Sequence, residues 1–138
     1  MLTGAIIGYL AVQDDDGPYV TPICLAAAEG HLYFHTGEGR RSRALAQDPR
    51  VCVAVTRDIR LQPSNEPCNV GYDFRSALVF GRAVLLETSS ERTQALDHLV
   101  ASHHAAATGE YDPDVLEQTL IYRIEVESIT QKQRPRTV

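Results

Sequence analysis

The stretch from His31 to Leu45, HLYFHTGEGRRSRAL, constrains the fold more than any other part of the sequence. Its first residues alternate, so that Leu32 and Phe34 fall on one face of a predicted strand and Tyr33 and His35 fall on the other. Two glycines then end the strand, and three arginines follow at the start of a short helical pattern. The chain therefore passes from strand to helix through a glycine turn.

This turn has the chemistry of a phosphate-binding corner. Gly37 and Gly39 let the backbone approach an anion closely, and the helix that follows presents unpaired N–H groups at its N-terminus. Arg40 and Arg41 add guanidinium groups that match phosphate oxygens. A solvated turn followed by a basic surface helix accounts for the same residues, so the residues alone leave both interpretations open. The third glycine of a dinucleotide fingerprint and the Walker motif are missing.

Short strand candidates separated by turns account for most of the remaining chain. Apolar or alternating segments predict strands over residues 6–12, 19–26, 31–36, 51–55, 74–86 and 121–129. Tight turns join the first three into a meander. Pro22 marks an edge, a bulge or a place where something other than a strand packs alongside. The strand over 51–55 is expected to be buried on both sides, and Gly81 predicts a bulge that bends the long strand.

Three helices and two irregular segments complete the pattern. A helix over 40–47 is expected to end before Pro49. A second helix is expected to begin at a capping box at Thr88–Glu91 and to end at about His103. A short third helix is expected from Pro113 to about Gln118. Residues 57–73 are predicted to be a long loop, and 131–138 a loose tail. Strands with inserted helices in this order favour an antiparallel barrel or sandwich over a doubly wound parallel sheet.

Composition limits the function classes. A chain of 138 residues fits one domain over 1–138, and a net charge of −5 argues against broad nucleic-acid binding. Lys132 is the sole lysine and lies in the polar tail, which disfavours a Schiff-base mechanism. Three cysteines without a CxxC pair fit reduced thiols in a cytoplasmic protein. We expect no metal, because the histidine spacings are poor, and no membrane partner.

Four runs of residues, taken in order, resemble one known family: PYVTPICLA, LYFHTGEGRRSRALAQDPRVCVAV, FRSALVFGRAVLLE and IYRIEVESITQK. With the PCNVG loop before the third run, the chain from Tyr9 to Lys132 resembles the FMN-binding split-barrel proteins. Within them it is most similar to the branch related to pyridoxamine 5′-phosphate oxidase and to the nitroimidazole-resistance (nitroreductase-like) proteins. The resemblance implies a mainly β fold, a six-stranded antiparallel split β-barrel (Greek key) with two or three flanking helices. It also implies a homodimer with an FMN in each of two clefts between the subunits.

The resemblance further implies which residues bind the cofactor. The basic pair that holds the flavin phosphate matches Arg40 and Arg41, and the turn around phosphate and ribityl chain matches His35, Thr36, Gly39 and Ser42. The strand whose backbone follows the isoalloxazine ring matches Pro22, Ile23, Cys24 and Leu25. The start of the long strand near the flavin matches Arg75 and Ser76. The histidine of the YFH run, His35, is the candidate catalytic residue, expected to orient or protonate substrate.

Some residues depart from the family pattern. Arg41 stands where relatives often have lysine, which keeps the charge and adds a fork. Val70 stands where relatives often have tryptophan. The basic side chains that recognise pyridoxal phosphate are not evident, so vitamin B6 oxidation is not supported.

The function implied is an FMN-dependent oxidoreductase that passes electrons from a nicotinamide donor to a small organic acceptor. Two alternatives stay open at this point. One is the same barrel binding a deazaflavin or haem, which would still be a redox protein. The other is a non-catalytic protein that binds a flavin or another small ligand.

Overall fold

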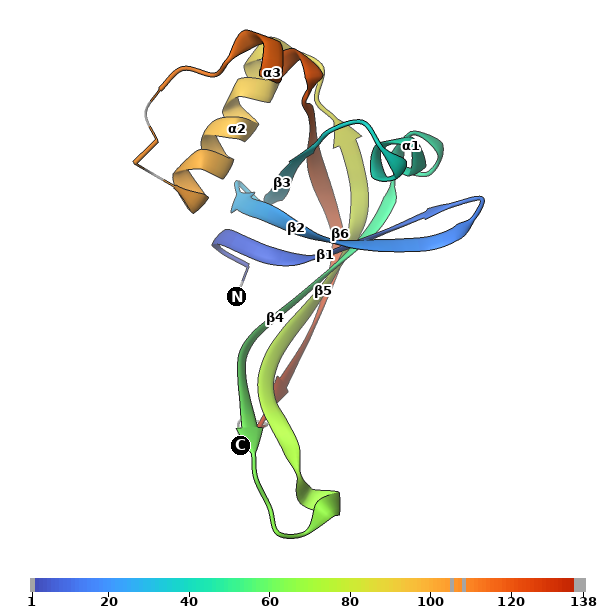
Figure 1. The fold of residues 1–138 in the computed structure, drawn as a ribbon, viewed down its shortest axis with the longest axis vertical. Coiled ribbons are helices and arrows are strands. Elements are labelled where there is room, and N and C mark those ends of the chain that lie inside the picture. The colour runs from blue at the N-terminus through green and yellow to red at the C-terminus, as the bar shows by residue number, and fades with distance from the viewer. Residues whose placement is uncertain (1, 105, 108, 136–138) are drawn as a thin grey trace.

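A computed structural model describes residues 2–104, 106–107 and 109–135 (Figure 1). The elements follow one another as β1 (Gly4–Asp14), β2 (Gly17–Ala28), β3 (His31–Thr36), α1 (Arg40–Gln47), β4 (Arg50–Gln62), the 3-10 turn η1 (Pro67–Asn69), β5 (Gly71–Leu85), α2 (Ser89–His103), α3 (Pro113–Gln118) and β6 (Leu120–Arg134). The three predicted helices are confirmed. No helix in the described part of the chain combines the length and apolar character needed to cross a membrane.

The six strands pair in an antiparallel manner and close into a ring in the order β1-β2-β3-β6-β5-β4. The predicted meander is present, because β1 pairs with β2 and β2 pairs with β3. Helix α2 lies across one end of the barrel against β1, β2, β3 and β6 (Figure 1). The predicted mainly β split barrel with flanking helices is therefore confirmed.

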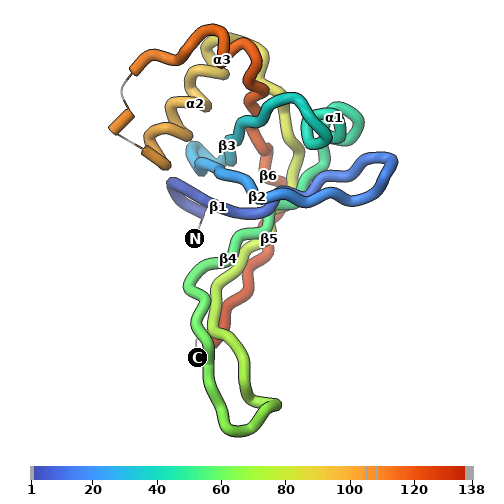
Figure 2. Tube along the Cα trace, viewed as in Figure 1, coloured from blue at the N-terminus to red at the C-terminus, as the bar shows by residue number. Residues whose placement is uncertain are grey.

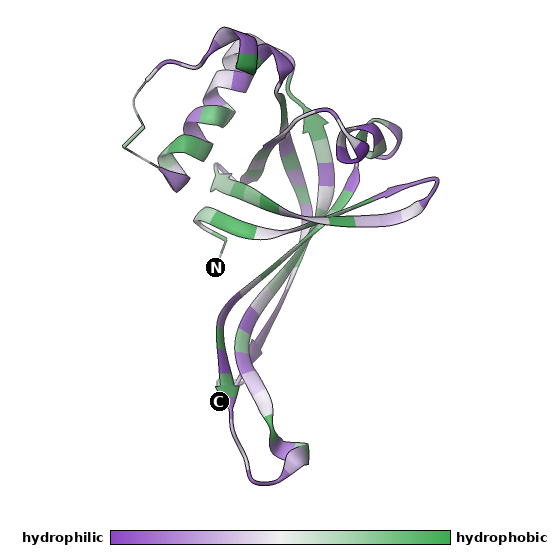
Figure 3. Ribbon diagram, in the orientation of Figure 1, coloured by the Kyte–Doolittle hydropathy of each residue, from purple (hydrophilic) through white to green (hydrophobic). Residues whose placement is uncertain are grey.

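The barrel core consists of the inward-facing half of each alternating strand. Ile6 and Leu10 of β1, Phe34 of β3, Val53 of β4 and Val79 of β5 are almost completely buried. Phe34 also stacks on Tyr122, with ring centroids 5.0 Å apart. Apolar residues recur along the barrel strands, whereas the tip of the β1–β2 hairpin, outside the core, is hydrophilic (Figure 3).

A second apolar cluster lies outside the barrel, beneath α2. Ala95, Leu96 and Leu99 of the helix pack with Tyr33 of β3 and Ile121 of β6. Strand β3 is consequently buried on both faces along its middle, one face inside the barrel and the other under the helix. This double burial fixes the strand that leads into the glycine turn.

Gly81 produces the predicted bulge in β5. The pairing of β5 with β6 shifts between Phe80 and Gly81, and a Cβ atom at Gly81 would lie 2.1 Å from the carbonyl oxygen of Glu125. No other residue permits that approach, because every other side chain begins with the Cβ atom. The bulge lies within the barrel part of β5, between the core residues Val79 and Ala83.

A long extension beyond the barrel corrects two predictions. Residues 57–73 are not one loop: β4 continues to Gln62, and β5 begins at Gly71. Residues 131–134 are not a loose tail, because β6 pairs with β5 as far as Arg134. The three strand ends run together away from the barrel as an arm (Figure 2). The rest of the predicted tail, residues 136–138, lies outside the described residues.

The centre of β4 also differs from its prediction. Val51, Val53 and Val55 face the core, but Cys52 and Ala54 on the opposite face are only half-buried. Strand β4 thus has one buried face and one apolar outer face that the described residues leave partly exposed.

The barrel is split between β2 and β3. These strands pair only from Ala26–Ala28 to His31–Tyr33, so among the described residues β2 from Gly17 to Leu25 has no strand partner on its β3 side. Helix α1 begins beside this gap. The predicted anion-binding corner therefore lies at the split.

Candidate functional site

The start of α1 is ordered by a local contact that involves Ser42. The backbone N–H of Gly39 donates to Ser42 Oγ, and Ser42 Oγ donates to the carbonyl oxygen of Gly39, each over 3.0 Å. Ser42 is buried. Its hydroxyl therefore fixes the first turn of α1, and the two arginines at the start of this helix take defined directions.

Arg41 bridges the split between β2 and β3. Its Nε donates to Thr21 Oγ1 over 3.1 Å, its Nη1 to Thr36 Oγ1 over 3.2 Å and its Nη2 to the carbonyl oxygen of Pro22 over 3.3 Å. All of these acceptors are uncharged. Among the described residues no carboxylate forms an ion pair with Arg41. The guanidinium charge at the split is consequently not neutralised.

Arg40, in contrast, is paired with a carboxylate at the tip of the β1–β2 hairpin. Its Nε donates to Asp14 Oδ2 over 2.8 Å and its Nη2 donates to Asp14 Oδ1 over 3.1 Å, a bidentate contact. The guanidinium carbon also lies 4.4 Å from the ring centroid of Tyr19. The hydrogen bonds from Arg40 lower the pKa of Asp14, so this pair stays charged in neutral solution.

The open edge of β2 is the surface beside Arg41. Pro22 and Cys24 point outward, whereas the side chains of Ile23 and Leu25 are buried in the barrel. Ile23 and Leu25 can therefore offer a ligand only their backbone. The edge ends at Leu25, whose carbonyl oxygen lies 2.6 Å from His103 Nε2 on α2. Pro22, which lacks an N–H, lies on this open edge, so the prediction that it marks an edge is confirmed.

His35 lies beside the corner but does not join its hydrogen bonds. It pairs with Ile121 of β6, its side chain reaches the surface, and no hydrogen bond from its ring is present among the described residues. Loss of solvent around the ring nevertheless lowers the pKa of His35 below its ordinary value. An imidazole that is neutral at pH 7 can accept a proton there, and the imidazolium that results can return it.

Arg75 and Ser76 are not brought to the corner within one chain. They lie on β5 where it enters the arm, and Arg75 Nε donates to Asp58 Oδ2 over 2.6 Å. The structure gathers Pro22, Thr36, Gly39, Arg41 and Ser42 with Arg40 at the split and leaves Arg75 and Ser76 on the arm. The remaining predicted residues lie along the open edge of β2 (Ile23, Cys24 and Leu25) and at the end of β3 (His35).

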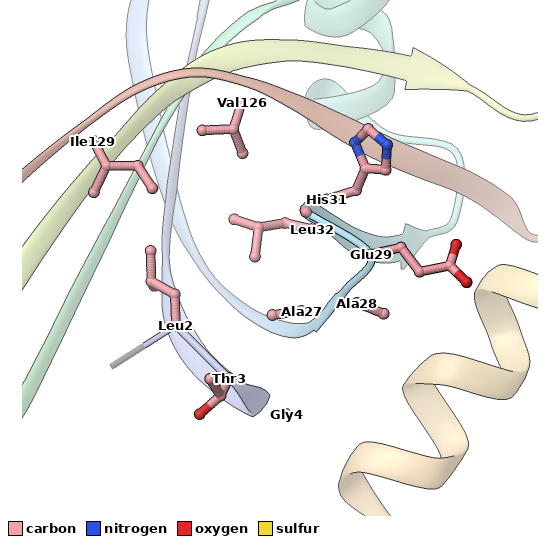
Figure 4. Close-up of a pocket in the computed structure, with 11 residues that line it drawn as sticks. Leu2, Thr3, Gly4, Ala27, Ala28, Glu29, His31, Leu32, Val126 and Ile129 are labelled. Carbon is pink, nitrogen blue, oxygen red and sulfur yellow. The ribbon is translucent and has the colours of Figure 1, made fainter.

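An apolar cavity lies elsewhere on the barrel (Figure 4). It has a volume of about 320 Å³, and its walls include Leu2, Ala27, Leu32, Val126 and Ile129. Glu29 at its edge points away toward α2 (Figure 4). None of the predicted site residues lines this cavity. Its described lining includes His31 but no arginine or lysine for a phosphate, so the candidate site is the corner at the split.

Sequence reasoning missed the residues that hold the two arginines. Asp14 belongs to an acidic turn, and Thr21 and Tyr19 belong to the strand after it. Their contacts with α1 connect positions about 20 residues or more apart. One sequence signal could have predicted the ion pair of Arg40 with Asp14: the turn at Asp14 is the nearest cluster of acidic residues to the arginine run. Nothing in the local pattern indicated that His103 ends the open edge.

The fold and the corner together define the class of protein: a six-stranded split barrel with an unneutralised arginine at the split. The sequence model of the pyridoxamine 5′-phosphate oxidase family matches residues 1–133, and the chain belongs to this family. No curated protein matches the chain significantly.

Solved structures share the fold. A candidate 5-nitroimidazole antibiotic resistance protein from Bacteroides thetaiotaomicron is 22% identical with a TM-score of 0.79, over 92% of this chain and 76% of that one. An FAD- and haem-binding protein from Mycobacterium smegmatis is 21% identical with a TM-score of 0.84, over 98% and 68%. An FAD-binding protein from Mesorhizobium loti is 26% identical with a TM-score of 0.67, over 94% and 87%.

Proposed function

We propose that this protein is a homodimeric, FMN-dependent oxidoreductase that transfers electrons from a nicotinamide donor to a small organic acceptor. The observation that carries the proposal is the position of Arg41, which lies across the split of the barrel without a carboxylate partner among the described residues. Structural neighbours of the chain include flavin-binding proteins, which supports the proposal. We place it in the cytoplasm, because its three cysteines are free thiols.

The residues at the split fit a phosphorylated flavin. Arg41 supplies charge, and the hydroxyl groups of Thr21 and Thr36 beside it supply hydrogen bonds for phosphate oxygens. The unpaired backbone of β2 from Thr21 to Cys24 offers polar groups to the edge of a planar ring. A bound flavin would supply hydride transfer, and this chain would anchor the phosphate and exclude water from the ring.

His35 is the side chain we propose to exchange a proton with substrate. Its place at the end of β3, one residue before Thr36, puts it next to the phosphate anchor. Its lowered pKa keeps the imidazole neutral near pH 7, the form that accepts a proton, and the imidazolium that results can return the proton.

The proposed dimer uses the apolar outer face, which we define as Pro22, Tyr9, Ala54 and Leu78 in one row across four strands and Val20, Ala11, Cys52 and Phe80 in the next. Tyr9, Val20, Leu78 and Phe80 are all at least 40% exposed in one chain. A contiguous apolar patch of this kind favours association. A second copy on this face is also the source we propose for the arm residues Arg75 and Ser76, which one chain keeps apart from the corner.

The test of the cofactor compares two ligands that differ only in the phosphate. FMN and riboflavin are titrated against the native protein and the Arg41→Ala variant, and binding is followed by flavin fluorescence. Loss of one charge-assisted contact should weaken FMN by about 1.5–3 kcal/mol and leave riboflavin unchanged. Arg82→Ala on β5, which removes an exposed arginine paired with Glu127, serves as the control. Equal FMN affinity in native protein and Arg41→Ala would contradict the proposed anchor.

The absorption spectrum of the purified protein distinguishes the remaining candidates. Two flavin bands that bleach on addition of a nicotinamide donor support the proposal. A Soret band would indicate haem, and a single deazaflavin band would indicate the other cofactor. A protein that binds FMN but is not reduced by either nicotinamide would be a flavin carrier rather than an oxidoreductase.

A further inference from the structure

The two neighbouring arginines at the start of α1 differ in charge compensation. Arg41 donates to uncharged oxygens, whereas Arg40 makes a bidentate ion pair with Asp14 at 2.8 and 3.1 Å. A carboxylate presents two oxygens to the guanidinium fork in the same way as a phosphate does. Asp14 therefore occupies the donors that a phosphate at this corner would use.

Asp14 is held in this position by its own hairpin. Its Oδ1 accepts the backbone N–H of Asp16 over 3.0 Å, and 14% of its side chain is exposed. Tyr19 covers the other side of Arg40, with the guanidinium carbon 4.4 Å from the ring centroid. The carboxylate is thus fixed beside the anion site by contacts that do not depend on a ligand.

We propose that Asp14 is a specificity-determining residue of the corner that limits its affinity for phosphate monoesters, because it neutralises Arg40 and occupies its guanidinium fork. This inference rests on the proposed flavin site. A phosphate at the corner does not gain the fork of Arg40 while Asp14 occupies it. Riboflavin, which carries no phosphate, does not experience this effect.

The test replaces the carboxylate with a neutral group of the same shape. Asp14→Asn keeps an oxygen for the N–H of Asp16, removes the charge and releases Arg40. The dissociation constants of FMN and riboflavin are measured at one ionic strength for the native protein, Asp14→Asn and the control Asp16→Asn, which alters the same turn. We expect Asp14→Asn to bind FMN about tenfold more tightly, since a charge-assisted contact outweighs an exposed ion pair. Riboflavin affinity should not change, and Asp16→Asn should show less than half of the gain.

A second comparison shows whether Arg40 mediates the gain. With Arg40→Ala in the background, the improvement from Asp14→Asn should fall, because the released guanidinium is no longer there. An Asp14→Asn protein that binds FMN no better than the native protein, or that gains equally for riboflavin, would overturn the inference. Should Asp14→Asn fail to fold, Asp14→Ser removes the same charge and keeps an oxygen for Asp16.

The outcomes separate this inference from the proposed function. If Arg41→Ala loses FMN but Asp14→Asn does not gain it, the phosphate site stands and the role of Asp14 is wrong. If the native protein binds FMN only weakly and Asp14→Asn binds it well, the inference is supported. If no variant distinguishes FMN from riboflavin, both are wrong.

Discussion

Adjacent residues of the same type take different roles at the corner, and the cause is the direction in which each side chain leaves the helix. Arg40 points to the tip of the β1–β2 hairpin and meets Asp14, while Arg41 points into the split and meets Thr21 and Thr36. The presence of two cations could be predicted from the sequence. Which of them keeps a free charge could not, because that depends on a hairpin folded against the helix.

His35 provides a prediction at the scale of one titrating group. Its pKa in the folded chain lies below the ordinary value, so its contribution to stability is present above the unfolded pKa and is lost as the pH falls through the folded pKa. The His35 resonance, identified by its absence in His35→Gln, should titrate at lower pH than an unfolded histidine in NMR spectra. A midpoint at or above about 6.5 would contradict this prediction.

Asp48 provides a second prediction, after the end of α1. Hydrogen bonds from Arg50 lower its pKa to about 2 from an ordinary value of 3.8. The stabilisation is therefore present above pH 3.8 and is lost as the pH falls toward 2. Asp48→Asn should be less stable than the native protein to urea at pH 7, and this difference should shrink as the solution is acidified.

The control for Asp48 is Asp15→Asn, in the exposed turn between β1 and β2. It should change the urea midpoint little at either pH, since exposed charges without close partners contribute little to stability. A difference between native protein and Asp48→Asn that stays constant down to pH 2 would show that the carboxylate acts through shape and not through charge.

At the scale of elements, Gly81 is the position where backbone approach decides the geometry of the sheet. In Gly81→Ala the new Cβ atom would lie 2.1 Å from the carbonyl oxygen of Glu125, so β5 and β6 would have to separate. Urea unfolding should show a loss of about 1–3 kcal/mol. Gly71→Ala, at the start of the same strand with no atom within 4 Å of the new Cβ, should change stability by less than about 0.5 kcal/mol.

The elements that the sequence predicted are those with one buried face. Strand β1 and the barrel part of β5 alternate, because their inward residues fill the core. The arm has no such face: from Asp58 to Leu61 every residue of β4 is exposed. Backbone pairing and surface side-chain contacts, such as those of Arg75 with Asp58 and of Gln62 with Asp73, hold these strands, so no buried face marks them in the sequence. The paired end of β6, residues 131–134, was missed for the same reason.

At the scale of the whole molecule, the proposed dimer makes the outer apolar face testable. Leu78→Lys would bury an unpaired ammonium between two copies, which costs several kcal/mol. Sedimentation velocity should show a dimer for the native protein and a monomer for Leu78→Lys. Val115→Lys on α3, a residue 61% exposed and outside this face, should leave the dimer intact.

FMN binding by the Leu78→Lys variant tests whether the proposed dimer is needed for the flavin site. If the second copy supplies Arg75 and Ser76, the monomeric Leu78→Lys protein should lose FMN together with its partner. A native protein that stays monomeric at all concentrations, or a Leu78→Lys monomer that binds FMN with native affinity, would contradict the shared site.

The antiparallel strands followed from alternation and turn positions, and their closure into a split barrel followed from the resemblance to a known family. The complete site did not follow in the same way. Arg75 and the residues of the corner belong to one predicted site, yet they lie in different regions of one chain. In the proposed dimer two subunits form each site, and the sequence of one chain does not indicate which subunit contributes each residue.

The gap between β2 and β3 has a consequence for handling the protein. From Gly17 to Leu25 one side of β2 has no neighbouring strand, and unpaired edges of this kind recruit strands from other molecules. A ligand lying along that edge would shield it. We therefore expect cofactor-free preparations to aggregate on storage or warming, and light scattering to fall when FMN is supplied.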